Sequence, residues 1–101
     1  FYAYGDLDML EVYRMATRIL HFDHPVGDWP QAVTSTPAKV MRLDGFGMLA
    51  AGSAADFVVF RGRSWTELLS RPESDRIVVR DGRAIERHLP DYAELDELMV
   101  K

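Results

Sequence analysis

Two imidazole rings and a carboxylate occur within four residues, at His21, Asp23 and His24. Histidine nitrogens and carboxylate oxygens are common ligands of zinc and other transition metals. However, the group follows a predicted helix, where histidine also interacts well with the helix dipole. No third strong ligand lies nearby in the sequence. We therefore expect loop and helix-end packing here rather than a metal site.

Three acidic residues, Asp6, Asp8 and Glu11, could suggest a carboxylate pair for acid–base catalysis. They precede or open a predicted helix, where free backbone N–H groups stabilise negative side chains, so we interpret them as helix-start residues. His88 stands alone and is interpreted as a surface histidine. No catalytic constellation is complete, and we assign neither a catalytic residue nor a metal ligand to this chain.

A glycine-punctuated stretch contains Gly45, Gly47 and Gly52. It matches neither GxGxxG nor GxxxxGK[ST], the two common phosphate-binding patterns. We expect these glycines to occupy turns with positive φ, a conformation that other residues adopt at a cost.

Aromatic side chains gather at the start of the chain, at Phe1, Tyr2 and Tyr4, directly before Gly5. Aromatic residues in this position could line the mouth of a pocket, and they could equally well pack in a core. The residues alone leave both interpretations open.

The composition is that of an ordinary soluble globular domain, with 101 residues, 48% hydrophobic and 28% charged. A net charge of −4 argues against a nucleic-acid partner. The absence of cysteine excludes disulfides and a thiol nucleophile and fits a cytoplasmic protein. Apolar runs fall short of the roughly 20 residues of a membrane helix, so we expect no membrane partner. The first residue is Phe1 rather than Met, and we expect an upstream part.

Helical patterns dominate the first half of the chain. Residues 6–20 predict a helix capped by Asp6 or Asp8, with one apolar stripe formed by Met9, Val12, Tyr13, Ala16, Ile19 and Leu20. A second helix is predicted from Asp28 or Trp29, with Pro30 in its first turn. A third is predicted over residues 37–43, capped by Thr36.

Strand patterns follow in the second half. Phe57–Phe60 predicts a strand buried on both faces, and 76–80 and 83–87 predict a hairpin joined by Asp81-Gly82. Short helices are predicted after Ser64, with Glu67 completing a capping box, and over residues 91–99. Two or three strands alone are marginally stable, so we expect that further strands of this sheet lie outside the chain.

Three stretches carry a resemblance to a known family: VTSTPAKVMRLDGFG at 33–47, AAGSAADFVVF at 50–60 and RIVVRDGRAI at 76–85. Together they resemble the C-terminus of the metal-dependent amidohydrolase superfamily, with Thr36 in place of the usual Asn. The opening FYAYGDLDMLEV resembles the cytosine deaminase branch, and the ending LPDYAELDELM resembles a subgroup of that branch.

The resemblance implies a (β/α)₈ barrel with a small β domain built from both chain ends. It implies zinc or iron in the parent enzyme, held by an HxH pair, further histidines and an aspartate, and a metal-bound hydroxide that attacks a pyrimidine-type ring and releases ammonia. None of those ligand motifs occurs here, so we expect the chain alone to bind no metal and to be inactive.

The resemblance also implies a division of this α/β fragment. Residues 1–43 would form the last barrel loop and the closing helices, 44–90 the C-terminal half of the small β domain, and 91–101 a C-terminal helix. Phe1 and Tyr2 would contact a small heterocyclic substrate.

Two other functions stay open from the sequence. One is a different amidohydrolase activity, such as triazine or cyclic-amide hydrolysis. The other is a non-catalytic interaction module. Whatever the function, the apolar stripe of residues 6–20 needs a covering surface. It could be a second copy of the chain, the β unit or the barrel, and we expect a homo-oligomer.

Overall fold

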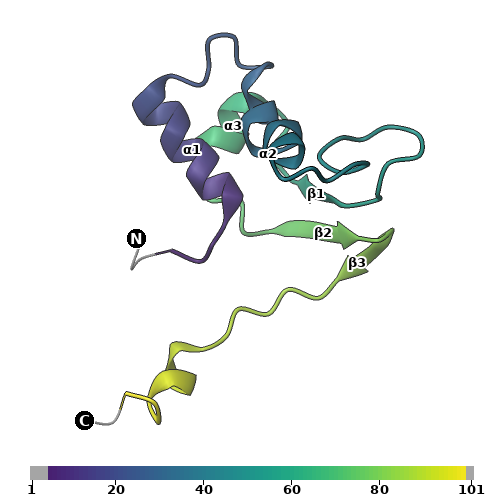
Figure 1. Cartoon of the computed structure of the whole chain (residues 1–101). Coiled ribbons are helices and arrows are strands. Elements are labelled where there is room, and N and C mark those ends of the chain that lie inside the picture. The colour runs from purple at the N-terminus through teal and green to yellow at the C-terminus, as the bar shows by residue number, and fades with distance from the viewer. Residues whose placement is uncertain (1–4, 100–101) are drawn as a thin grey trace.

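The computed structural model describes residues 5–99. Between Met9 and Ile85 the chain forms four helical elements and three strands, and a last helical turn follows. In chain order they are α1 (Met9–Leu20), η1 (Trp29–Val33), α2 (Ser35–Val40), β1 (Phe57–Phe60), α3 (Trp65–Ser70), β2 (Arg76–Arg80), β3 (Arg83–Ile85) and η2 (Tyr92–Leu95). Figure 1 shows α1, α2 and α3 above β2 and β3, and the C-terminal segment running away from both.

Helix α1 begins where the sequence predicts. The side chain of Asp8 accepts a hydrogen bond from the backbone N–H of Leu10 at 3.0 Å, so Asp8 rather than Asp6 is the cap. His21 ends the helix in the left-handed region, with φ 60, and its N–H donates to the carbonyl of Thr17. One long helix therefore supports the N-terminal half of the structure.

The predicted third helix starts earlier than expected. Its cap position is Thr34, so Thr36 lies inside α2 and the prediction of Thr36 as the cap is wrong. Pro37 is tolerated because the first N–H groups of a helix have no partner within it. Past Val40 the N–H of Leu43 donates to the carbonyl of Ala38, a 6→1 bond with Arg42 left-handed at φ 56. The second predicted helix forms a single 3₁₀ segment, η1.

The three strands form one antiparallel sheet in the order β1-β2-β3. Phe57 pairs with Val79, and Arg80 pairs with Arg83 across a two-residue turn. Both turn residues have positive φ, 50 for Asp81 and 75 for Gly82, as the tight hairpin turn requires. The predicted hairpin is confirmed, but β3 ends at Ile85 instead of residue 87.

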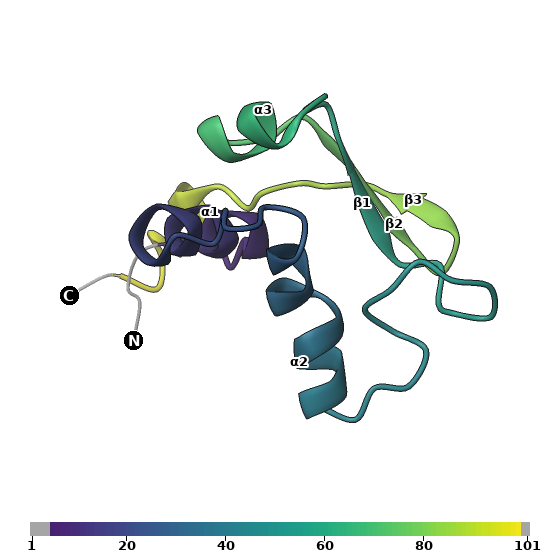
Figure 2. The ribbon, with the colours of Figure 1, turned by 90° about the horizontal axis from the view of Figure 1, so that it is seen from above.

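The loop between α2 and β1 is tied to the hairpin turn. The N–H of Gly82 donates to the carbonyl of Ala55 at 3.0 Å, and the N–H of Asp81 donates to the Asp56 carboxylate at 2.7 Å. In Figure 2 this loop runs from the end of α2 across to the turn between β2 and β3. Gly45, Gly47 and Gly52 have positive φ in this loop, as predicted.

Two short helical elements, α3 and η2, lie in the second half of the described chain. Ser64 caps α3 by accepting from the N–H of Glu67 at 3.2 Å, whereas the Glu67 carboxylate accepts from the N–H of Arg63 rather than of Ser64, so the predicted capping box is half formed. Asp91 and Glu94 do form a capping box. The helix that they start is a 3₁₀ turn ending at Leu95, shorter than the predicted 91–99.

Little of the described chain is buried. Among residues 5–99 only Tyr13 and Ala38 are buried, and β1 is exposed on both faces, with Val58 41% and Val59 47% accessible. The predicted double-sided burial of β1 is therefore wrong for this chain alone, because no layer of the described residues covers either face.

The overall dimensions agree with this open packing. The chain exposes 8977 Å², whereas a folded monomer of 11.5 kDa exposes about 5,800 Å². The radius of gyration is 16.0 Å, compared with about 13 Å for a compact domain of this length. In the described part no helix is long and apolar enough to cross a bilayer.

Candidate functional site

The two predicted substrate-binding residues, Phe1 and Tyr2, lie outside the described residues. The described chain starts at Gly5, and two residues before α1 have positive φ, 135 for Gly5 and 57 for Leu7. The candidate site is therefore described from the contacts that hold the start of α1 in place.

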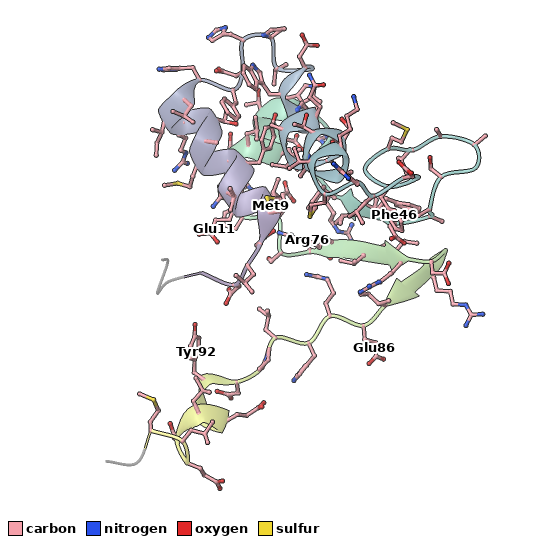
Figure 3. All side chains as sticks on the ribbon, in the orientation of Figure 1. Met9, Glu11, Phe46, Arg76, Glu86 and Tyr92 are labelled. Carbon is pink, nitrogen blue, oxygen red and sulfur yellow. The ribbon has the colours of Figure 1, made fainter. Side chains whose placement is uncertain are left out.

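Asp8 and Arg76 make the main polar connection between α1 and the sheet. The two guanidinium nitrogens of Arg76 donate to the two carboxylate oxygens of Asp8, Nη1 to Oδ1 at 2.8 Å and Nη2 to Oδ2 at 2.9 Å. Such parallel, charge-assisted bonds are among the stronger hydrogen bonds in proteins. Figure 3 shows Arg76 next to the first turn of α1, which carries Met9 and Glu11.

The pair is partly shielded from solvent, since the side chains of Arg76 and Asp8 are 14% and 29% exposed. The hydrogen bonds from Arg76 lower the pKa of Asp8 below its ordinary value, and the N–H of Leu10 acts in the same direction. Partial burial raises the pKa of Asp8, but this effect is smaller than that of the hydrogen bonds from Arg76. Asp8 is therefore a carboxylate at neutral pH with two tasks, helix cap and ion-pair partner.

The histidine-containing loop after α1 is organised by aromatic packing. The rings of Phe22 and Trp29 stack with centroids 4.1 Å apart, and Nε1 of Trp29 donates to the carbonyl of His24. His24 is 80% exposed and approaches Asp23 at 3.8 Å. Nowhere in residues 5–99 do three or more histidine or acidic side chains converge as a metal-ligand group. The described residues therefore do not fit a catalytic metal.

Tyr13 is the best buried large side chain of the described chain, 3% exposed. Burial raises the pKa of Tyr13. Within residues 5–99 its hydroxyl and Nε of Arg14 meet no hydrogen-bond partner. Buried polar atoms without a partner are uncommon in native proteins. We therefore expect these two atoms of α1 to form hydrogen bonds with groups beyond residues 5–99.

The surface of the described residues includes two shallow depressions near α1. One, of about 350 Å³, lies between the end of α1 and α3 and is lined by Thr17, Asp23, Val26, Trp65, Thr66, Leu69 and Ser70. The other, of about 230 Å³, lies between Asp6 and the segment around Leu89–Leu95. Neither brings together the groups of a catalytic site.

Apolar side chains are exposed over α1 and the sheet. The α1 stripe predicted from the sequence includes Met9 (53% exposed), Val12 (55%), Ile19 (66%) and Leu20 (61%). Monomeric proteins rarely leave contiguous apolar surface of this kind uncovered. These faces have the character of contact surfaces.

Comparison with known proteins identifies the type of protein. A model of the Amidohydrolase family matches residues 1–85. A pterin deaminase of Rhizobium rhizogenes strain K84 is 52% identical over 99 residues, which is 98% of this chain. The chain spans 23% of the length of that relative. No solved structure matches the chain significantly.

The match to the family model includes the α2 region, the glycine loop, β1 and the hairpin, which are the stretches that carry the resemblance in the sequence. The match and the curated relative agree on the same assignment. The chain belongs to the amidohydrolase family of metal-dependent hydrolases.

Proposed function

We propose that this chain is the C-terminal region of a deaminase that hydrolyses the bond between a heterocyclic ring carbon and its amino group. The observation that carries the proposal is the 52% identity with a pterin deaminase across nearly the whole chain. A pterin contains an aminopyrimidine ring, so it also satisfies the expectation of a pyrimidine-type substrate. The same family match leaves room for related ring hydrolases.

The structural role proposed for the chain is to complete a larger fold. Residues 1–43 would be the last loop and closing helices of a barrel, and 44–90 would supply strands to a small β domain. The exposed stripe of α1 and the two uncovered faces of β1 support this role. A strand with apolar side chains on both faces is typical of a sheet covered on both sides.

Zinc or iron would be the metal of the complete enzyme. Because the described residues do not form a ligand group, we place the ligands in the rest of the protein. The contribution of this chain is then to substrate binding and to the scaffold. Phe1 and Tyr2 would stack on the flat ring of the substrate, an interaction suited to aromatic faces.

Cytosine is the second candidate substrate. The opening stretch at residues 1–12 favours it, because this stretch resembles the cytosine deaminase branch. Both substrates lose an exocyclic amino group as ammonia, so the reaction type is shared and only the size of the ring system differs.

Steady-state kinetics of the full-length protein distinguish these substrates. We expect ammonia release from pterin with a kcat/KM at least about tenfold above that for cytosine, a ratio within reach of contacts to one additional ring. The deaminated product should be verified by mass spectrometry. The opposite ratio would assign cytosine, and no ammonia from either compound would reject the proposed function.

A further inference from the structure

Residues 86–99, which we call the C-terminal arm, leave the body of the chain after β3. Figure 1 shows the arm running away from the sheet and the helices. Its large apolar side chains are uncovered: Leu89 is 72% exposed, Tyr92 76%, Leu98 80% and Met99 73%. Apolar side chains gathered in this way mark a contact surface.

The arm has a defined local structure. Asp91 and Glu94 form a capping box at the start of η2, and the N–H of Leu98 donates to the carbonyl of Leu95 at 2.9 Å. With hydrogen bonds of this i→i+3 kind, residues three positions apart lie on the same side of the turn. The arm therefore carries an apolar row beside an acidic row: the first is Tyr92, Leu95 and Leu98, and the second is Asp91, Glu94 and Glu97.

The charge of the arm restricts what can bind it. Between Leu89 and Met99 the arm contains four acidic residues and no lysine or arginine. Complementary potentials favour binding, and like charges opposite each other oppose it. A surface that fits the arm is therefore apolar with adjacent basic groups.

One face of the sheet has both properties. Arg80 and Arg83 pair across the hairpin turn, so their side chains leave the sheet on the same face. By the alternation of side chains along a strand, the same face carries Val58, Val78 and Ile85. We call these five residues the hairpin patch. Both arginines are exposed, and Val58 and Ile85 are 41% and 45% exposed.

The two arginines of the hairpin patch lack acidic partners. Like charges directly opposite each other destabilise a sheet, and neither Arg80 nor Arg83 takes part in an ion pair within residues 5–99. An acidic partner from outside would convert this repulsion into attraction.

The arm of the same copy points away from the hairpin patch. Strand β3 begins with Arg83 at the turn and ends at Ile85, and the arm continues from that end in the direction away from the turn (Figure 1). Near the start of the arm, the side chain of Arg87 donates to the carbonyl of Ser74. The basic end of the patch is therefore left to an arm from another molecule.

The comparisons separate the arm from the part of the fold that the family model describes. That model matches residues 1–85 and ends where the arm begins, whereas the match with the pterin deaminase covers 98% of the chain and so includes most of the arm. A contact between copies is a role that such an addition can have without altering the shared fold.

We propose that the C-terminal arm binds the hairpin patch of a second copy, with the apolar row against the valines and Ile85 and the acidic row against the two arginines. Because each copy has one arm and one patch, the exchange is reciprocal and closes as a symmetric dimer. The contact covers apolar side chains that a single copy leaves in water and supplies acidic partners to both arginines. This inference is independent of the substrate and of the proposed function.

The test uses the full-length protein with two charge reversals, Glu97→Lys in the arm and Arg83→Glu in the patch. Glu97 takes no part in the capping box and both side chains are exposed, so either variant should fold. The control is Asp28→Lys, the same change of charge at an exposed residue whose side chain caps no helix. Sedimentation velocity over a series of protein concentrations gives the dissociation constant of the dimer for each protein.

We expect the wild type and Asp28→Lys to dimerise with the same dissociation constant. Each charge reversal should weaken dimerisation about tenfold, because it places like charges opposite each other. An equimolar mixture of the two reversed proteins should recover the wild-type affinity to within about threefold. In the mixed dimer the arm with Glu97→Lys meets the patch with Arg83→Glu, and the unaltered arm meets the unaltered patch.

Leu98→Ala tests the apolar row separately. Leu98 is 80% exposed in a single copy, so its truncation should leave the fold intact and weaken the dimer about three- to tenfold. A monomeric wild type would overturn the inference. A dimer with unchanged affinity in both charge reversals would do the same, since it would form through another surface. Reversals that weaken the dimer but fail to complement each other in the mixture would place the arm on its own polypeptide and would also overturn it.

Discussion

Gly47 shows at the residue scale why the loop after α2 needs a glycine. Its φ is 78, and a Cβ at this position would come 2.7 Å from the carbonyl oxygen of Thr34 and 2.9 Å from Cβ of Ala38. The contact is with backbone and a buried alanine, neither of which can move aside easily. The glycine lets the loop lie directly on the start of α2.

We predict that Gly47→Ala lowers the free energy of unfolding of the full-length protein by about 2–3 kcal/mol, from the strained φ and the steric overlap together. Chemical denaturation of both proteins measures it. Gly27→Ala is the matched control, since a Cβ there meets no atom within 4 Å and should change stability by less than about 0.5 kcal/mol. Equal effects of the two substitutions would contradict the packing described for Gly47.

The lowered pKa of Asp8 gives a prediction about acid. Because the folded-state pKa lies below the ordinary value of 3.8, the ion pair contributes stability that is fully present above that value. This stability is lost as the pH falls through the folded-state pKa. The stability difference between wild type and Asp8→Asn should therefore be constant from neutral pH down to about pH 5 and should shrink below it. Urea midpoints across this range measure it, and a difference that grows in acid would be inconsistent with the pair.

Sequence reasoning at this scale succeeded only where the partner is local. Asp8 can be predicted as a helix cap because its partner, Leu10, is two residues away. Arg76 could not be paired with it from the sequence, since nothing in a strand of five residues specifies an acidic partner 68 positions earlier. The sequence analysis therefore missed the ion pair between Asp8 and Arg76.

At the scale of elements, local turn chemistry determines the hairpin. Asp81 and Gly82 both have positive φ, and the turn also anchors the loop before β1 through Asp56 and Ala55. We predict that Asp81→Val destabilises the full-length protein by about 1–2 kcal/mol more than Asp81→Gly does, because a β-branched side chain is strained at left-handed φ.

Thermal or urea denaturation of the two Asp81 variants measures this difference. Both substitutions remove the carboxylate, so the comparison isolates backbone strain. If the valine variant were as stable as the glycine variant, the hairpin turn would have another conformation in the full-length protein.

Helix α1 and the hairpin were predictable because their signals are contained in short stretches: a cap, an apolar stripe and an Asp-Gly pair. The burial of β1 was not, because burial depends on which layers cover a strand. Phe57–Phe60 has the composition of a buried strand, yet the described residues leave it exposed. The last helix was predicted too long, over residues 91–99 instead of Tyr92–Leu95, for a related reason: isolated helical turns are marginal without a packing surface.

At the scale of the whole molecule, the surface is too large for the mass. The exposed area of 8977 Å² exceeds that of a compact monomer by roughly half, and the excess includes apolar side chains of α1 and β1. Fully burying one such side chain contributes about 1.5–3 kcal/mol to the free energy of unfolding. We therefore expect the chain to be stable in contact with the rest of the protein, or with a second copy when that is missing.

The most direct measurement of the account is ammonia release from pterin by the purified full-length protein and by the 101-residue chain, side by side, with bound metal quantified in both. We predict that the full-length protein binds metal and releases ammonia, while the chain alone does neither. A folded chain of 101 residues that binds metal and deaminates pterin would contradict the proposal that the catalytic ligands lie elsewhere, as would a metal-loaded full-length protein that releases no ammonia from any aminopyrimidine.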